Sequence, residues 1–231
     1  FYQCIFHNSR VPWRADKVYQ MMLNAPVNVL NRIGLSGRLR AVNEVEANSV
    51  RIAGIGGGRV GEAMVVVGNL LLDFDYSIMS RVWNVPNQSF RDLALETMEE
   101  RVGTLNKLGC NHTPESLEPY LIEAFAESLD RPVQESQLER EEIQFGKNTA
   151  NDLSSNEFLS LHHSNGEVSP MESLKISADV FIYHIHLQIE DRGEDVSVRV
   201  DNGIITDLKT ESPRKNNLRK LLIGYPFSDW V

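Results

Sequence analysis

Residues 54–61 carry five glycines, and they separate an apolar segment that begins at residue 50 from a second one at 63–72. Both apolar segments contain β-branched residues, which favour strands. The sequence therefore predicts a strand over 50–55, a glycine turn, and a strand over 63–72. Because glycine has no Cβ, such a turn lets the backbone approach a ligand and present N–H groups to its anionic or carbonyl oxygens. A tight hairpin or a bulged connection is the competing interpretation.

The segment 56–61 also matches the Gly-x-Gly-x-x-Gly pattern of dinucleotide-binding sites. That motif requires a helix to begin at the turn, so that the helix N-terminus binds the pyrophosphate. Here residues 64–68 read Met-Val-Val-Val-Gly, which favours a strand over a helix. A dinucleotide site is therefore disfavoured.

The composition is that of a globular protein with an acidic surface. The net charge of −9 argues against a nucleic-acid partner, because phosphate binding needs positive charge. The longest apolar run, 63–72, is far shorter than the ~20 residues that span a membrane, so no membrane partner is expected. Two cysteines, Cys4 and Cys110, are too few for a disulfide framework. We expect reduced thiols, no signal peptide and a cytoplasmic location.

Periodicity and capping residues predict the other elements. A strand is expected at 1–7 and another at 39–45, and helices at 16–33, 75–82, 90–105 and, from a start at Thr113 or Ser116, to 129. Pro26 is expected to kink the first of these helices. Residues 134–150 form a charged helix with solvent around it, and short strands follow residue 170, with a tight turn at 201–203 and a last helix at 216–223.

These elements predict an α+β protein whose mixed or antiparallel sheet is flanked by helices. Residues 1–150 form the predicted core, 151–170 a polar linker, and 171–231 a small α+β accessory domain.

Histidines and serines give no clear catalytic or metal motif. His184 and His186 alternate on one predicted strand, and His162 and His163 are adjacent in a loop. Neither pair has cysteines or carboxylates at metal-ligand spacing, so no metal ligand is assigned. No nucleophile-elbow pattern accompanies the serines.

Four segments occur in a characteristic order. They read Gly-Leu-Ser-Gly-Arg-Leu-Arg-Ala-Val-Asn-Glu-Val at 34–45, Arg-Ile-Ala-Gly-Ile-Gly at 51–56, Val-Gly-Asn-Leu-Leu-Leu-Asp-Phe-Asp at 67–75 and Val-Pro-Asn-Gln-Ser-Phe-Arg-Asp at 85–92. Their order resembles the lipoate–protein ligase branch of the biotin/lipoyl ligase and octanoyltransferase family. The resemblance extends from residue 1 to about 130, and residues 172–231 are similar to the accessory domain of such ligases.

The resemblance implies an enzyme that activates lipoate or octanoate with ATP and Mg²⁺ and transfers the acyl group to a lysine of a lipoyl carrier domain. It places Asn43 and Glu44 near the nucleotide and metal, where the family has Asn-Asp. The residues expected to bind the nucleotide or the acyl group are Asn43, Glu44, Gly54, Gly56, Gly57, Gly58, Gly68 and Asn69. Bare glycine amides and a nearby arginine suit the phosphate, and the strand 63–72 suits an apolar chain.

Two departures from the family pattern bear on catalysis. Arg51 stands at the position of the family's key lysine, so Arg51 is assigned as the catalytic residue, although a planar guanidinium is not a conservative replacement for an ammonium group. The family's Arg-Arg-x-Ser/Thr-Gly-Gly-Gly motif belongs before residue 1, so we expect a missing N-terminal segment or a partner chain that supplies it. The alternative is a non-catalytic relative that binds a lipoyl carrier domain or an acyl ligand.

Overall fold

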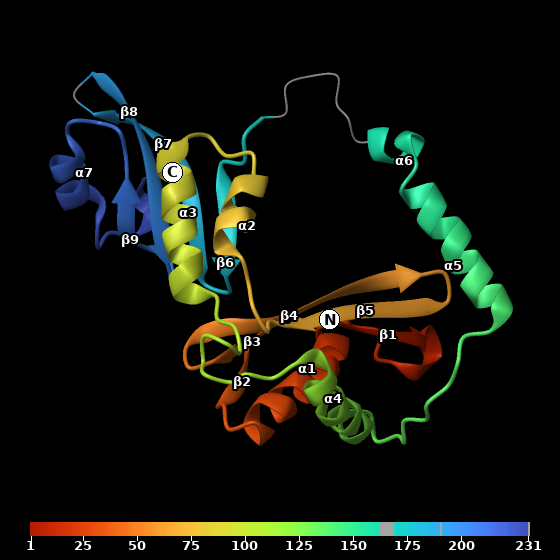
Figure 1. Cartoon of the computed structure of the whole chain (residues 1–231). Helices are drawn as coiled ribbons and strands as arrows, with labels where there is room; N and C mark the ends of the chain where they lie inside the picture. Colours follow the sequence, from red (N-terminus) through yellow and green to blue (C-terminus); the bar gives the residue numbers. More distant parts are fainter. Residues whose placement is uncertain (162–168, 190, 231) are drawn as a thin grey trace.

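Alternating apolar residues in the first third of the chain build a five-stranded antiparallel sheet, which we call the N-terminal sheet (Figure 1). The computed structural model describes residues 1–161, 169–189 and 191–230. The strand order is β1-β5-β4-β3-β2. The strands are β1 (Tyr2–His7), β2 (Gly37–Arg40), β3 (Glu44–Ala47), β4 (Val50–Val60) and β5 (Ala63–Leu70). The predicted strand at 39–45 is thus two strands joined by a turn.

Two helices, α1 (Ala15–Arg32) and α4 (Pro114–Leu129), pack together beneath the N-terminal sheet (Figure 1). The apolar face of α1 is fully buried in the core with β3, β4 and β5. Helix α1 continues through Pro26 without a break. Thr113, rather than Ser116, caps α4, and Ser116 completes a capping box with it.

A second antiparallel sheet, the C-terminal sheet, follows in the order β6-β7-β8-β9. Its strands are β6 (Ser173–Ser177), β7 (Val180–Ile189), β8 (Arg192–Asp201) and β9 (Ile204–Lys209). The predicted tight turn is confirmed: Asn202 and Gly203 both have positive φ, as a two-residue hairpin between β8 and β9 requires. Helix α7 (Lys215–Leu222) packs on β9.

Two helices from the middle of the chain connect the sheets. Helix α2 (Tyr76–Val82) begins at the predicted cap Asp75, and helix α3 (Gln88–Arg101) follows it. Helix α3 packs against all four strands of the C-terminal sheet and also contacts β4. Phe90, Leu93 and Met98 share a core with β6 and β7, although about 80 residues separate these segments. The two sheets therefore meet around α3.

The glycine-rich segment is a strand, which corrects the prediction of a turn. Gly56 and Gly58 pair with Val67 and Val65 in the long β4–β5 hairpin. The chain reverses after Val60, at Gly61, whose φ is +56°. Glycine weakens a strand by its conformational entropy, but the β-branched partner strand β5 supplies a full ladder of hydrogen bonds. The predicted strand 50–55 therefore extends to residue 60.

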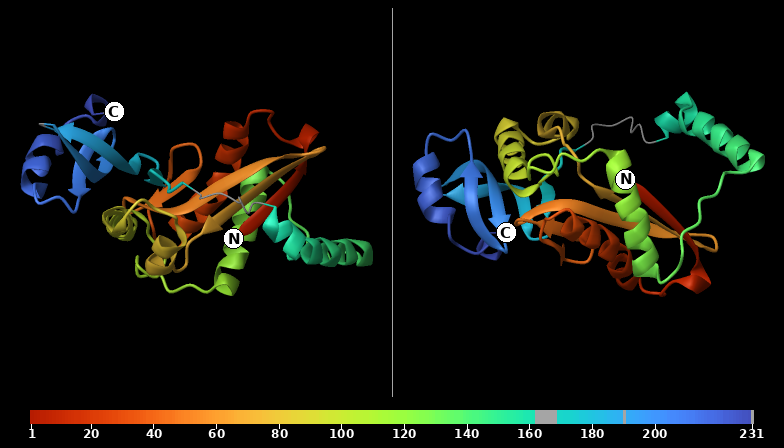
Figure 2. Two further views of the ribbon diagram at one scale, coloured as in Figure 1. Left: turned by 90° about the horizontal axis from the view of Figure 1, so that it is seen from above. Right: turned by 60° about the horizontal axis from the view of Figure 1, so that its bottom comes forward.

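The segment after α4 lies apart from both sheets (Figures 1 and 2). Helix α5 (Arg140–Leu153) buries none of its residues, as predicted for the charged segment. Helix α6 (Asn156–Ser160) lies within the predicted linker, and residues 162–168 of that linker are outside the described residues. His162 and His163 fall there too. In the described parts of the chain, no helix is both long and apolar enough to cross a membrane.

An α+β architecture with antiparallel sheets flanked by helices is confirmed.

Candidate functional site

Three of the predicted site residues form a row across the N-terminal sheet. Glu44 on β3 lies opposite Gly54 on β4, and Gly54 lies opposite Asn69 on β5. Residues that lie opposite each other in an antiparallel sheet share one face. The Asn69 side chain also accepts a hydrogen bond from the Gly54 backbone N–H at 2.8 Å. The row is thus tied together by both strand pairing and a side chain.

A β-bulge brings Arg51 onto the same face as this row. Arg51 lies opposite Glu46, while Gly54 lies opposite Glu44, so three steps on β4 match two steps on β3. Without the extra residue, Arg51 and Gly54 would point to opposite faces. The guanidinium extends over Gly54, and Arg51 Nη2 is 2.8 Å from the position of a Cβ on that residue. The absence of a side chain at Gly54 therefore leaves the space that the Arg51 guanidinium occupies.

Glu44 is buried, with 2% of its surface exposed, and the C-terminal sheet neutralises it. Its Oε1 is 3.0 Å from Lys175 Nζ, and its Oε2 accepts a hydrogen bond from the Ala178 backbone N–H at 2.8 Å. Arg51 Nη1 lies 4.0 Å from Oε1. A buried carboxylate needs such partners, because removing a charge from water is costly. Glu44 thus connects the two sheets directly beside Arg51.

An apolar cavity of about 220 Å³ lies on one side of Arg51. Its polar lining residues are Arg51, Asn69 and Lys175. The apolar part of the lining comes from α2, α3, β6 and the connections that follow β5, α2 and α3, and its residues are Leu71, Phe74, Met79, Trp83, Met98, Val102 and Ile176. Two cations and one amide therefore stand at the wall of an otherwise apolar space. We call this the apolar cavity.

A second cavity of about 220 Å³, the polar cavity, lies between the two sheets and shares Arg51 with the first. Its lining is Arg38, Arg40, Glu44, Val45, Glu46, Ser49, Arg51, Arg101, Ser177 and Val180. Four of these residues are arginines, from β2, β4 and α3. Arg51 therefore stands between an apolar space and an arginine-rich one.

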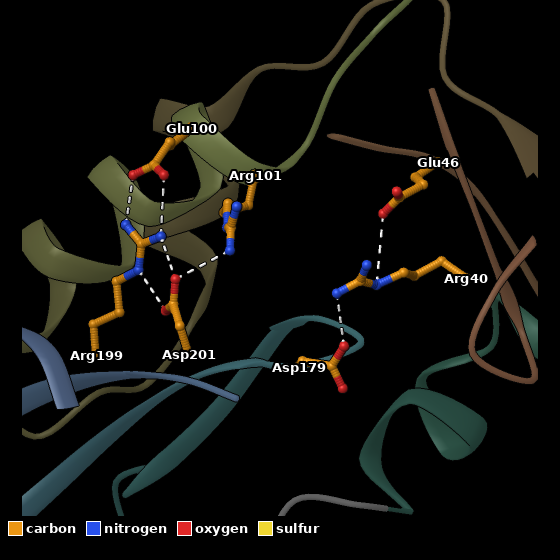
Figure 3. Close-up of polar contacts among 7 residues, drawn as sticks. All are labelled: Arg40, Glu46, Glu100, Arg101, Asp179, Arg199 and Asp201. Atoms are coloured by element: carbon orange, nitrogen blue, oxygen red, sulfur yellow. Dashed lines mark hydrogen bonds and ion pairs between the residues drawn. The ribbon is translucent and has the colours of Figure 1, made fainter. Parts of the chain in front are cut away.

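Ion pairs with neighbouring carboxylates hold two of these arginines in place (Figure 3). Arg40 Nη2 is 2.8 Å from Asp179 Oδ2, and Arg40 Nε is 3.6 Å from Glu46. Arg101 Nη2 is 3.0 Å from Asp201 Oδ2. Figure 3 shows Arg40 and Arg101 extending toward the same space from β2 and α3. Side chains held in this way are positioned before any ligand arrives.

A further pair joins α3 to β8. Arg199 bonds to both Glu100 and Asp201, with Nη2 3.1 Å from Glu100 Oε1 and Nε 2.8 Å from Asp201 Oδ1. The hydrogen bond from Arg199 lowers the pKa of the Glu100 carboxyl below its ordinary value. The same contact raises the pKa of Arg199, although burial opposes that change. This pair holds α3, and with it Arg101, against the C-terminal sheet.

Asn43 and all five predicted glycines are absent from the linings of the two cavities. Asn43 is in the turn between β2 and β3, where its backbone oxygen accepts a hydrogen bond from Ile55 N–H at 3.0 Å. A Cβ on Gly56 or Gly58 would meet nothing within 4 Å, so these two glycines face open space. A Cβ on Gly57 would lie 2.3 Å from a backbone oxygen of β5, so Gly57 is required by the sheet itself.

Gly68 makes room for a core tyrosine. A Cβ on Gly68 would lie 2.2 Å from the ring of Tyr2, which stands opposite it on β1. Burial raises the pKa of the Tyr2 hydroxyl, so the ring packs as a neutral group. Phe125 of α4 contacts the same ring edge-on, with 4.9 Å between centroids. In this structure Gly68 contacts Tyr2 and belongs to the core.

The described residues do not fit a protein-bound Mg²⁺ ion. They contain no group of three or more His, Cys, Asp or Glu side chains that could hold a metal. The two carboxylates beside Arg51 are occupied by the chain's own donors: Glu44 by Lys175 and Ala178, and Glu46 by Arg38 and Arg40. A divalent cation needs free oxygen ligands.

The residues that complete the site could not be found from the local sequence. Lys175, Arg40 and Arg101 come from β6, β2 and α3, and no motif links them to residues 44–69. They meet because α3 and the C-terminal sheet pack against β3 and β4. The only available signal was the arginine content of 38–40, in a chain that is acidic as a whole.

Comparison with solved structures finds the same fold in lipoate ligases. One match comes from the work on a bi-partite lipoate protein ligase and its E2 lipoyl domain from Thermoplasma acidophilum, with a TM-score of 0.62 and 22% identity over 72% of this chain and 65% of that one. A lipoate-protein ligase A bound with ATP matches with a TM-score of 0.55 and 20% identity, over 68% of this chain and 62% of that one. A T. acidophilum protein with bound lipoic acid matches with a TM-score of 0.53 and 19% identity, over 68% and 62%.

This chain spans less than two thirds of the length of each of these three structures. At these identities the similarity shows a shared fold. No curated protein sequence gives a significant match. Residues 1–126, more than half of the chain, match the family model of the lipoyl protein ligase A/B catalytic domain. The chain therefore belongs to the lipoyl protein ligase A/B catalytic domain family.

Proposed function

We propose that the protein attaches lipoate, or a related medium-chain acyl group such as octanoate, to a lysine of a lipoyl carrier domain through an acyl-adenylate. The observation that carries this proposal is the place of Arg51, which lines both the apolar and the polar cavity. An acyl-adenylate has an apolar chain, a mixed anhydride and a phosphate in that order. The two cavities offer an apolar space and an arginine-rich space in the same order, with Arg51 at the junction.

The chemistry assigns a role to each charged group at that junction. In the first step a carboxylate oxygen of the acyl group attacks the α-phosphorus of ATP, an O–P bond forms, and pyrophosphate leaves. In the second step the carrier lysine amine attacks the acyl carbonyl, a C–N bond forms, AMP leaves and the amine loses a proton. Negative charge grows on phosphoryl and carbonyl oxygens in these steps. Arg51 and Lys175 are the cations beside the apolar cavity that stabilise it.

Arginine at position 51 suits the substrate's anionic end. Its fork binds carboxylate and phosphate oxygens with two parallel hydrogen bonds, and it keeps its charge at any relevant pH. The Asn69 amide lies across Gly54 from it and provides a further polar contact at the same wall. Lys175 supplies the compact ammonium charge that Arg51 cannot.

A larger apolar cavity of about 560 Å³ lies between β1 and α4, but it suits this substrate less well. Its charged lining residues are the two carboxylates Glu115 and Glu118. These repel the carboxylate of a fatty or lipoic acid. We therefore place the acyl chain in the apolar cavity beside Arg51.

This placement is compatible with the predicted division of the chain. We propose residues 1–150 as the ligase core, 151–170 as the connection and 171–231 as an accessory unit that contributes Lys175 and Ile176 to the site. The carrier domain is proposed as the partner, because one of the matched structures belongs to a lipoylation system with an E2 lipoyl domain. A cytoplasmic location is consistent with the free cysteines Cys4 and Cys110.

The test is ATP-dependent loading of a lipoyl carrier domain by the whole protein. Lipoate and octanoate are supplied in separate reactions, pyrophosphate release and acyl-adenylate are measured without carrier, and the mass of the carrier is measured after its addition. We expect AMP-linked acyl product in the first assay and an acylated carrier in the second. Binding of the acids without any adenylate would contradict the proposal and support the non-catalytic alternative.

A further inference from the structure

The part of the N-terminal sheet nearest the β4–β5 turn has one exposed face. Met64 and Val66 of β5 belong to the core that the sheet shares with α1 and α4. Because side chains alternate along a strand, Val65 and Val67 point to the other face. Val67 is 40% exposed, and Ile5 of β1, which lies opposite Val65, is 66% exposed. We call the surface of Ile5, Val65 and Val67 the open face.

The neighbouring strand β4 adds no side chains to the open face. Gly58 lies opposite Val65, and Gly56 lies opposite Val67. A Cβ on either glycine would meet nothing within 4 Å. The surface is thus apolar along β1 and β5 and bare along β4. Exposed apolar side chains that lie side by side are typical of a surface that contacts another element.

The open face continues directly into the candidate site. Asn69 follows Val67 by two residues on β5, so the two side chains share a face. Asn69 lines the apolar cavity together with Arg51 and Lys175. An element that covers the open face would therefore border the apolar cavity.

Helix α5 carries an apolar stripe that could cover this surface. The helix buries none of its residues, and Ile143 and Leu153 are 43% and 48% exposed. Residues at intervals of three or four lie on one face of a helix. The stripe consists of Ile143, Gly146, Ala150 and Leu153. Because the two central residues are small, the helix can approach a sheet closely along this stripe.

The position and length of α5 also suit the open face. Figure 1 shows α5 and α6 on the side of the sheet away from α1 and α4. Residues 130–139 connect α4 to α5, and a connection of this length can extend about 33 Å. With 14 residues α5 is about 21 Å long. Strand β5, with 8 residues, is about 26 Å long, so the helix can lie along the strand.

We propose that α5 and α6 form a lid that closes on the open face, with the stripe of α5 packed against β1 and β5. The lid is open in this structure. When closed, it borders the apolar cavity and keeps water from the acyl-adenylate, so that water does not cleave the mixed anhydride to the free acid and AMP. This protective role rests on the proposed function. The closure itself rests on the two apolar surfaces.

Disulfide trapping in the whole protein tests the closure. Val67→Cys and Ala150→Cys are combined, the protein is oxidised mildly at low concentration, and peptide mapping identifies the bonded cysteines, including the half-buried Cys4 and Cys110. We expect a disulfide between positions 67 and 150 within one chain. The control combines Val67→Cys with Asn148→Cys. Position 148 lies on the opposite side of α5 from the stripe, so this pair should form a disulfide at least about tenfold more slowly.

Leu153→Asp tests whether the apolar stripe drives the closure. Added to the first cysteine pair, it should slow trapping at least about fivefold, because closure would bury a carboxylate. It should also speed hydrolysis of the acyl-adenylate, measured as AMP release without carrier. The fold should remain intact, since α5 buries none of its residues. Asn148→Asp adds the same charge to the opposite side of α5 and is the control for both measurements.

Three trapping results would overturn the lid. They are equal rates for the two cysteine pairs, no disulfide between positions 67 and 150, and a disulfide that joins two chains, which would assign the open face to a second copy. If acyl-adenylate forms but trapping fails in one of these ways, the lid is wrong and the proposed function stands. If trapping succeeds but no adenylate forms with either acid, the lid stands and the proposed function fails.

Discussion

The guanidinium of Arg51 occupies the space that a side chain on Gly54 would fill, with Nη2 2.8 Å from the position of that Cβ. Gly54→Ala should therefore displace Arg51 from the junction of the two cavities. The displaced atoms are the free end of a flexible side chain, so the fold should lose less than about 1 kcal/mol. Acyl-adenylate formation should fall at least about tenfold, or about 1.4 kcal/mol in transition-state stabilisation.

Gly56→Ala is the matched control, because a Cβ at Gly56 meets nothing within 4 Å. It adds the same methyl group to the same strand and should leave the rate of adenylate formation near its original value. Equal rate losses in both variants would show that the strand, rather than the place of Arg51, is responsible.

Arg51→Ala removes the cation that both cavities share. We expect no measurable adenylate formation, measured as ATP-dependent pyrophosphate release with lipoate or octanoate. Arg51→Lys keeps the positive charge but loses the planar guanidinium, so it should retain part of the activity. We expect kcat to change more than KM. Unchanged activity in Arg51→Ala would show that the assignment of Arg51 as the catalytic residue is wrong.

Glu44, Arg51, Gly54 and Asn69 were predicted from the family resemblance, and the structure brings these four together. The sequence did not predict that Arg51 and Gly54 share a face of the sheet. Side chains alternate along a regular strand, so residues three apart should point to opposite faces. The β-bulge changes this locally, and no residue type in the segment predicts a bulge.

The glycine segment shows the opposite case. Its five glycines predicted a ligand-binding turn, but pairing with β5 extends β4 through them. Gly57 and Gly68 are explained by close contacts inside the sheet and with Tyr2, not by a ligand. Lys175, Arg40 and Arg101 were missed because only the packing of the two sheets around α3 brings them to the site.

Gly57 and Gly58 give a second matched pair, this time for stability. A Cβ on Gly57 would lie 2.3 Å from the Val65 backbone oxygen, while a Cβ on Gly58 would meet nothing. Gly57→Ala should destabilise the protein by about 1–3 kcal/mol, since the hairpin backbone has to move. Gly58→Ala should lie within about 0.5 kcal/mol of the original. The measurement is the urea midpoint of each variant.

The Glu44–Lys175 contact ties the two sheets together and should be measurable by a double-mutant cycle. Glu44→Ala leaves Lys175 Nζ and the Ala178 N–H without their acceptor, so we expect a loss of about 1–3 kcal/mol. Lys175→Met should cost at least as much, because it leaves the buried Glu44 carboxylate without its nearest cation. The double variant should be more stable than the sum of the two single losses predicts, as for residues in contact. Additive losses would show that the two groups do not interact.

The Glu100–Arg199 pair should make the junction sensitive to acid. Its hydrogen bond lowers the pKa of Glu100 below the ordinary 4.5. A carboxyl whose pKa is lower in the folded state stabilises the fold above its ordinary pKa, and this contribution is lost as pH falls through the lowered value. Glu100→Gln lacks the titrating group but is otherwise similar in shape. The difference in urea midpoint between the two proteins should therefore be largest near about pH 7 and shrink below about pH 4. A difference that stays constant over this range would show that the ion pair contributes nothing to the stability of the folded protein.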